Sequence, residues 1–334
     1  MLPFALVIFA CGCATRREEN LSRYEFTQPQ MGLPFRIVLY ARDENAARQA
    51  ARAGFGRIKQ LNDIFSDYDS DSELSRLSQT SGQQKKVPLS PDLWKVLERA
   101  QQLARTTDGA FDITVGPVVN LWRKARREKK FPDAQKLAAA RARVGYKNLL
   151  LDPRNHSAEL LVPDMRLDLG AIAKGYAVDE ALKVLRTNDV TRALVAGGGD
   201  MAAGDAPPGQ RGWRIEVAPL DVLNAPPARF VWLRNAGLAT SGDLFQHLEI
   251  DGRRYSHIVD PHTGIGLTDH SLVTVIAPDG VTADGLSTAV SVLGPERGIQ
   301  LVEATRGAAV HIVRMPSGKI EQRESARFGK FYAR

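Results

Sequence analysis

The chain has 334 residues, of which 43% are hydrophobic and 25% charged, with a net charge of +7 and a sequence pI of about 9.5. This balance allows a large buried core and excludes a wholly disordered or fibrous chain. Much of the basic excess lies in the run Arg123–Lys130, which contains no aromatic residue to stack on a base. We therefore expect no nucleic-acid partner and interpret the run as a solvated helix or loop.

The first 13 residues, MLPFALVIFACGC, form an apolar segment too short to span a bilayer. They are typical of the hydrophobic part of a secretory signal, although a positive n-region is missing. Both cysteines lie here, in a sequence typical of bacterial lipoprotein processing. Cys13 fits the lipidated position better, and Cys11 is the alternative. A third interpretation is a plain signal peptide without lipidation. We expect a lipoprotein-type signal over 1–13, a tether over 14–30 and one domain over 31–334, lipid-anchored on the periplasmic side of a bacterial membrane.

The first half of the chain carries both helical and extended patterns. Residues 35–41 predict a strand, and apolar residues at helical spacing predict helices over 45–64 and 90–108. The second helix has a typical start, because a capping serine at 90 precedes a proline at the first helical position. The glycines and proline of 109–117 favour a shaped loop.

The most informative stretch is Asp168-Leu-Gly-Ala-Ile-Ala-Lys-Gly-Tyr-Ala-Val-Asp179. It predicts a short strand, a turn at Gly170-Ala171 and a helix running to about Arg186. A helix start offers free N–H groups to an anion, and Lys174 in the first turn adds a positive charge. The pattern therefore indicates a phosphate site; the alternative is a tight connection with a solvated lysine.

The second half mixes strands and helices without strict alternation. Extended segments are expected over 191–196, 213–218, 230–233, 245–250, 255–259, 271–277 and 308–314, and helices over 282–293 and 296–305. This order favours an α+β fold, with helices packed on mixed or antiparallel sheets in one large domain, over a doubly wound parallel sheet.

Two later stretches carry candidate chemistry. Asp284 and Thr288 are four residues apart on an expected helix, so they share a face and offer oxygen ligands to a hard cation such as Mg²⁺. The alternative is an ordinary solvated helix start. His257 follows an expected strand and precedes turn residues, a setting consistent with a site loop, and His262 is a rival candidate.

Several motifs in one order resemble the ApbE-type flavin transferases, the FAD:protein FMN transferase family. These motifs are Phe111-Asp-Ile-Thr-Val-Gly-Pro117, Asp168–Asp179, Thr240-Ser-Gly-Asp243, Ser256-His-Ile-Val-Asp-Pro-His-Thr-Gly264 and Ala283-Asp-Gly-Leu-Ser-Thr288. The resemblance runs from about Met31 to the final expected strand. It implies that 31–334 form an FAD:protein FMN transferase domain with the family's own α+β fold.

The resemblance also assigns residues. It implies FAD contacts at Met31, Tyr68, Ala110, Phe111, Asp112, Asp168, Lys174, His257 and Ile258. It implies Mg²⁺ ligands at the Ala171 carbonyl, Asp284 and Thr288, and a catalytic role for His257. We expect the rings of Tyr68 and Phe111 to support the isoalloxazine or the adenine ring of FAD. Within the family resemblance, a tyrosine at position 68 favours transfer of FMN over hydrolysis of FAD.

The activity implied by the resemblance is a phosphoryl transfer. FAD donates FMN to a threonine or serine hydroxyl of an acceptor protein with an Asp-x-x-Ser/Thr-Gly-Ala-type motif, a subunit of a membrane redox complex, and AMP is released. His257, with an unperturbed pKa of about 6.5, suits the base, and Asp243 or His262 are the alternatives. Two other functions stay open: an FAD pyrophosphatase that yields FMN and AMP, and a non-catalytic flavin-binding lipoprotein.

Overall fold

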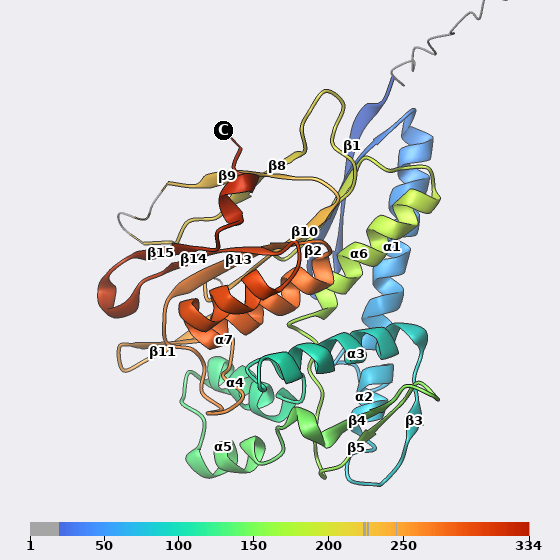
Figure 1. Cartoon of the computed structure of the whole chain (residues 1–334). Coiled ribbons are helices and arrows are strands. Elements are labelled where there is room, and N and C mark those ends of the chain that lie inside the picture. The colour runs from blue at the N-terminus through green and yellow to red at the C-terminus, as the bar shows by residue number, and fades with distance from the viewer. Residues whose placement is uncertain (1–19, 223–224, 226, 245, 334) are drawn as a thin grey trace, which may run out of the picture.

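The computed structural model describes residues 20–333 except 223, 224, 226 and 245. Its centre is an eight-stranded sheet of antiparallel neighbours in the order β1-β2-β6-β7-β10-β13-β14-β15 (Figure 1). Its strands are β1 (Ser22–Gln30), β2 (Leu33–Ala41), β6 (Ala193–Gly197), β7 (Asp200–Ala203), β10 (Ala236–Gly242), β13 (Ser271–Ala277), β14 (Ala309–Arg314) and β15 (Glu321–Glu324).

Three small sheets surround the large one. They are β3-β5-β4 (Val87–Pro88, Ser157–Leu160, Leu149–Asp152), β8-β9 (Trp213–Val217, Arg229–Leu233) and β11-β12 (His247–Ile250, Arg253–Ser256). The α-helices are α1 (Glu44–Phe65), α2 (Glu73–Ser78), α3 (Pro91–Thr106), α4 (Gly116–Glu128), α5 (Ala134–Arg141), α6 (Ala173–Thr187) and α7 (Gly280–Ala304). Helices packed on antiparallel sheets confirm the expected α+β class.

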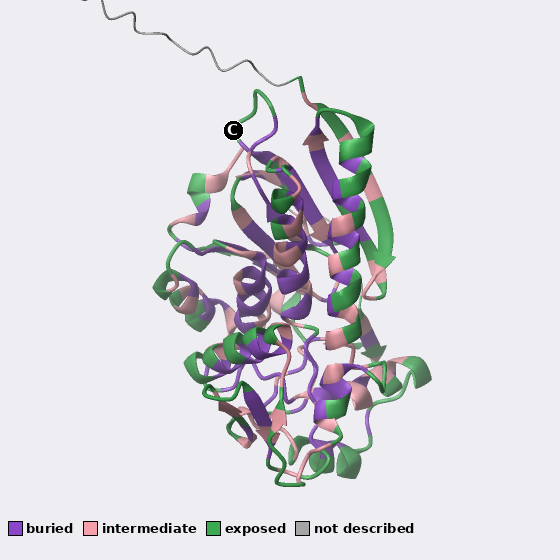
Figure 2. Cartoon of the chain, turned by 90° about the vertical axis from the view of Figure 1, so that its right-hand side faces the viewer, coloured by how far each residue is buried: buried purple, intermediate pink, exposed green. Residues whose placement is uncertain are grey.

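Strand β2 shows how the sequence builds the layers. Successive side chains of a strand point to opposite faces, so Ile37 and Leu39 pack into the core beneath α1 and α6. Val38, between them, packs on the other face with Val231 and Leu233 of β9. Helices therefore cover one face of the large sheet and the β8-β9 hairpin covers part of the other, with the buried residues concentrated between these layers (Figure 2).

Side chains cap the starts of two long helices. Ser90 Oγ accepts a hydrogen bond from Leu93 N at the start of α3, as predicted, and the Asp43 side chain accepts one from Ala46 N at the start of α1. The two helices expected over 282–305 form α7, which is interrupted at Gly294, where φ is +75° and proline follows. Glycine tolerates this left-handed φ without steric cost.

The prediction of a tether over 14–30 is partly wrong. Residues 22–30 form β1, an edge strand that pairs along its whole length with β2, so the sheet begins before Met31. Its polar composition suits an edge strand, because most of its side chains face solvent. The signal segment 1–13, with Cys11 and Cys13, lies outside the described residues.

Three helices are joined by one arginine. Arg57 of α1 donates to Asp92 of α3 at 2.9 Å and to Glu180 of α6 at 2.7 Å, and Tyr176 of α6 also donates to Asp92 at 2.8 Å. These side chains are largely buried, and Arg57 offsets part of the charge of the two carboxylates, while Lys183 also pairs with Glu180 at 2.7 Å.

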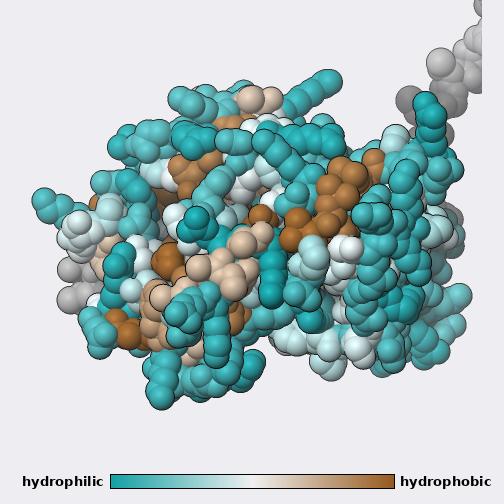
Figure 3. All heavy atoms as spheres, turned by 90° about the horizontal axis from the view of Figure 1, so that it is seen from below, coloured by the Kyte–Doolittle hydropathy of each residue, from teal (hydrophilic) through white to brown (hydrophobic). Residues whose placement is uncertain are grey.

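The exterior is mostly hydrophilic when seen from below, with separate apolar patches (Figure 3). Tyr68 is the most exposed large apolar side chain of the described chain, at 81%. Across residues 20–333, the four undescribed positions aside, no helix is both long and apolar enough to cross a membrane.

Candidate active site

The site is built where α6 crosses α7. Gly175 N donates to Asp284 Oδ2 at 2.9 Å, and a Cβ placed on Gly175 would lie 2.3 Å from the Gly280 carbonyl oxygen. Only glycine allows this close approach. Asp179, one turn further along α6, accepts hydrogen bonds from Gly280 N at 2.8 Å and Val281 N at 2.9 Å. The start of α7 is therefore fixed to α6, and Asp284 with it.

Lys174 lies among oxygen atoms instead of pointing into solvent. Its Nζ is 3.0 Å from the Gly170 carbonyl oxygen, 2.9 Å from Asp200 Oδ2 and 3.6 Å from Asp284 Oδ2. Burial alone would lower the pKa of Lys174, but the two carboxylates outweigh it and raise the pKa. The lysine is therefore charged, and the interpretation of a solvated lysine is wrong.

Two buried carboxylates share this one ammonium. Burial and the neighbouring Asp284 raise the pKa of Asp200 to about 7, although Lys174 opposes the shift. Both carboxylate side chains are only 3% exposed, so solvent screens little of their repulsion. The excess negative charge and the oxygen-only donors fit a hard divalent cation.

The predicted metal ligands are brought together in part. Asp284 and Thr288 lie one turn apart on α7, as expected, and Thr288 Oγ1 is 3.2 Å from Ser241 Oγ, which is in turn 2.7 Å from Ser287 Oγ. Ala171 lies in the turn before α6, and the metal-ligand role of its carbonyl stays a prediction. Among the described residues no three His, Cys, Asp or Glu side chains form a metal cluster, so a cation here also needs hydroxyl, carbonyl or non-protein oxygens.

A second charged group supports the turn before α6. Asp168 accepts from Gly170 N at 2.8 Å and pairs with Arg123 of α4 at 2.8 Å. Arg123 also pairs with Asp67, and its guanidinium lies 4.4 Å from the centroid of the Tyr68 ring. Burial raises the pKa of Asp168, although Arg123 opposes the shift.

The ring of Tyr68 is thus supported on one side and exposed on the rest. A cation beside an aromatic ring stabilises the orientation of the ring, and the contact of Tyr68 with FAD stays a prediction. Phe111 is different: it is 2% exposed and belongs to the main core. The structure therefore assigns the Phe111 ring to packing, and the expectation that it supports a flavin or adenine ring is not met.

The loop around Phe111 contains one buried carboxylate, that of Asp112. Ala110 is 3% exposed, and Asp112 accepts from Thr114 N at 2.8 Å and from Thr114 Oγ1 at 2.7 Å. Burial raises the pKa of Asp112. Met31 occupies the β1–β2 turn with a φ of +50°, followed by Gly32 at +76°, and is partly buried against the main core.

His257 has its imidazole oriented by one carbonyl. Its backbone N–H donates to Gln246 O at 3.0 Å, and Nδ1 lies 3.1 Å from the same oxygen. A neutral ring that donates from Nδ1 leaves the lone pair on Nε2. Burial lowers the pKa of His257 to about 4; Arg126 and Lys174 act in the same direction, and the Gln246 carbonyl and Asp243 oppose them. Ile258, the next residue, is buried.

The two rival bases have other partners. Asp243 pairs with Arg254 and lies 2.7 Å from His270 Nδ1, and it accepts from Ser271 N at 3.1 Å. His262 Nε2 lies 2.8 Å from the Asp108 carbonyl oxygen. These contacts give Asp243 a role in holding the β10–β13 region together, and the catalytic role of His257 stays a prediction.

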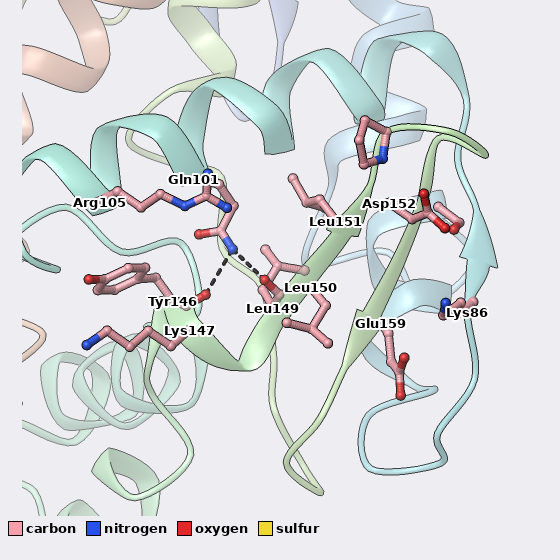
Figure 4. A pocket seen from close by; sticks show the side chains of 12 residues that line it. Lys86, Gln101, Arg105, Tyr146, Lys147, Leu149, Leu150, Leu151, Asp152 and Glu159 are labelled. Carbon is pink, nitrogen blue, oxygen red and sulfur yellow. Dashed lines mark hydrogen bonds between the residues drawn. The ribbon is translucent and has the colours of Figure 1, made fainter.

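One hollow of about 500 Å³ lies away from this chemistry. It is formed between α3 and the small sheet β3-β5-β4, and Gln101 reaches into it while donating to the Tyr146 carbonyl at 2.9 Å (Figure 4). None of the predicted site residues lines it. Lys174, Asp284 and His257 come instead from α6, from α7 and from the residue that follows β12.

Comparison with known proteins identifies the family. The sequence model of the ApbE family matches residues 31–312. The chain belongs to the ApbE family. An FAD:protein FMN transferase of Haemophilus influenzae is 35% identical over 275 residues, which cover 80% of each chain. One of Vibrio cholerae is 31% identical over 330 residues, which cover 98% of this chain and 97% of the relative.

Solved ApbE structures agree with the fold. The flavin transferase ApbE from Vibrio cholerae superposes with a TM-score of 0.81 at 30% identity, covering 93% of this chain and 99% of that one. The ApbE protein of Thermotoga maritima gives a TM-score of 0.82 at 30% identity, covering 94% and 100%. The expected family and fold are confirmed, and so is the expectation that the chain is a transferase.

The sequence did not single out three residues that contact predicted site residues: Arg123, Asp200 and Ser241. It also did not single out Asp67, which pairs with Arg123. Asp200 follows the glycine turn after β6, and Ser241 lies inside a motif that was recognised as a whole. Arg123 belongs to the basic run that was interpreted as solvated. Its spacing from the buried residues of α4 could have indicated that it faces the protein interior.

Proposed function

We propose that this ApbE-family chain transfers FMN from FAD to a serine or threonine hydroxyl of an acceptor protein and releases AMP. The names of the relatives support the reaction class. The observation that carries the proposal is the pair of buried carboxylates, Asp200 and Asp284, held beside the turn before α6 with a single ammonium between them.

The residues fit one Mg²⁺. Asp284, Thr288 and the Ala171 carbonyl would hold it, and the spare negative charge around Lys174 favours a divalent cation. When bound, Mg²⁺ neutralises charge on the pyrophosphate as a Lewis acid. Lys174 adds a positive charge at the same place, and Tyr68 offers a ring face for the flavin.

His257 acts as the general base that takes the proton of the attacking hydroxyl. The acceptor hydroxyl attacks the phosphorus of the FMN half, the new O–P bond forms, and the bond from that phosphorus to the bridging oxygen breaks. The hydroxyl proton moves to His257 Nε2, because Nδ1 is turned toward the Gln246 carbonyl. AMP leaves with the bridging oxygen. General-base help of this kind contributes about 10²–10⁴ in rate.

The partner and location belong to the same proposal. The acceptor is a flavin-carrying subunit of a membrane redox complex with an Asp-x-x-Ser/Thr-Gly-Ala-type motif. A lipid on Cys13, or on Cys11, would hold the enzyme on the periplasmic side of the membrane, where such an acceptor is presented.

The decisive experiment is incubation of the chain with FAD, Mg²⁺ and an acceptor protein bearing that motif, followed by mass measurement of the acceptor. We expect a gain equal to FMN minus water, lost when the motif hydroxyl is changed to alanine. Free FMN and AMP without an adduct would support hydrolysis instead, and intact FAD would support a binding protein.

A further inference from the structure

Three cationic side chains surround the candidate active site, and two of them are neutralised by carboxylates. Lys174 pairs with Asp200 and Asp284, and Arg123 pairs with Asp67 and Asp168. The third is Arg126, which forms neither an ion pair nor a hydrogen bond with any residue that the structure describes. Its charged neighbours are Arg123 and Arg127, which repel it.

The position of Arg126 follows from the packing of α4. Residues three apart on a helix share a face, so Arg126 lies one turn beyond Arg123 on the side turned to the site. The helix is held there by Trp122 and Ala125, which are buried, and the Trp122 ring lies 5.3 Å from that of Tyr255. Tyr255 is two residues before His257, so the packing brings this face of α4 beside the loop that carries the base.

A half-buried guanidinium without a carboxylate is costly unless an anion completes the site. Burial lowers the pKa of Arg126, and the repulsion of Arg123 adds to the effect. The planar fork of arginine matches the oxygens of a phosphate in a bidentate arrangement. Arg126 and Lys174 both lower the pKa of His257, so their charges act on the same region.

We propose that Arg126 binds a phosphate oxygen of the dinucleotide substrate near His257. The inference rests on the proposed function and names a further substrate-binding residue for it. Arg126 would then do two things: orient the phosphorus for attack, and help to keep the His257 ring neutral before the reaction. The basic run Arg123–Lys130 thereby divides into an inner pair, Arg123 and Arg126, and a solvated remainder.

The chain offers a matched control. Arg127 is the next residue, carries the same charge and is exposed on the outer side of α4. Arg126→Gln and Arg127→Gln therefore remove the same net charge from adjacent positions. Arg126→Lys retains the charge without the fork. Thermal melting of all three variants shows whether any effect comes from misfolding.

The test compares two ligands without an acceptor present. Binding of FAD and of riboflavin, which lacks phosphates, is measured by flavin fluorescence in the presence of Mg²⁺. We expect Arg126→Gln to weaken FAD binding by roughly 10- to 100-fold, as for a hydrogen bond to a charged group, and to leave riboflavin binding unchanged. Arg127→Gln should match the wild type for both ligands, and Arg126→Lys should be intermediate.

Other outcomes overturn the inference. Equal losses for FAD and riboflavin would mean that Arg126 supports the ring platform, and equal FAD affinity in both glutamine variants would mean that it contacts no phosphate. A change confined to the KM for the acceptor would assign it to the acceptor protein. If Arg126→Gln selectively loses FAD affinity but the wild-type chain transfers no FMN, the phosphate contact is upheld and the proposed function is refuted.

A pH profile of transfer gives a second readout. Removing the Arg126 charge leaves Lys174 and Asp243 as the charges acting on His257. The acid limb of the rate should move to higher pH in Arg126→Gln and stay in place in Arg127→Gln. An unchanged limb in both variants would show that Arg126 does not act at the base.

Discussion

Replacing Gly175 by alanine tests the α6–α7 crossing directly. An alanine inside a helix normally stabilises a protein by about 0.5–1 kcal/mol relative to glycine. At this position the new Cβ would lie 2.3 Å from the Gly280 carbonyl oxygen and 2.7 Å from the Cβ of Asp284. The first contact is with backbone, so a rotamer change cannot relieve it, and α7 has to move.

The expected size follows from these opposing terms. Overpacking of a close contact costs about 1–3 kcal/mol, which exceeds the helix-propensity gain. We expect Gly175→Ala to lower the free energy of unfolding by roughly 1–2 kcal/mol, a factor of about 5–30 in the unfolding equilibrium. Because Gly175 N also binds Asp284 Oδ2, the apparent affinity for Mg²⁺ should fall by about 10- to 100-fold.

The control is Gly56→Ala in α1, where a Cβ meets nothing within 4 Å. That variant should gain about 0.5–1 kcal/mol and keep its Mg²⁺ dependence. Urea unfolding and Mg²⁺ titration of transfer measure both effects. If Gly175→Ala proves as stable as Gly56→Ala, with the same Mg²⁺ requirement, the crossing does not position the metal ligand and the reasoning is wrong.

Four further predictions address the charged groups. Asp284→Asn, or excess EDTA with the wild type, should reduce transfer by a factor on the order of 100 or more while riboflavin binding persists; transfer that survives EDTA would exclude the metal. His257→Gln should bind FAD normally but transfer FMN about 10²–10⁴ times more slowly. In the wild type, the rate of transfer should decrease at acid pH with a midpoint near pH 4, which is the lowered pKa of His257. A midpoint near the ordinary histidine value of about 6.5 would contradict this lowered pKa. Burial raises the pKa of Asp179 to about 6, so the folded chain holds this proton more tightly than the unfolded chain; this contribution to stability is present at low pH and is lost as pH rises from about 4 to 6. Asp179→Asn should remove that slope from urea unfolding curves measured across this range, and parallel curves for variant and wild type would argue against it.

The sequence predicted what local patterns encode. The cap at Ser90, the helical spacing of α1 and α3, and the shared face of Asp284 and Thr288 each depend on residues a few positions apart. Such features form with little help from the rest of the fold, which is why they could be placed in advance.

Features that depend on distant partners could not be placed in this way. Arg123 meets Asp67 and Asp168 only because α4 packs over the turn before α6, and the distances along the chain are 56 and 45 residues. The buried position of Phe111 depends likewise on core packing with other elements. Strand β1 was missed because an edge strand needs few apolar residues, so its polar composition resembled a tether.

The arginine that joins α1, α3 and α6 constrains how the chain can change. Loss of Arg57 alone would leave Asp92 as a largely buried charge without its ion-pair partner and Glu180 with Lys183 only, so a single replacement is penalised although an apolar set of three could be tolerated. Arg57, Asp92 and Glu180 should therefore be substituted together in the evolution of this chain. Libraries built for directed evolution should vary these three positions jointly.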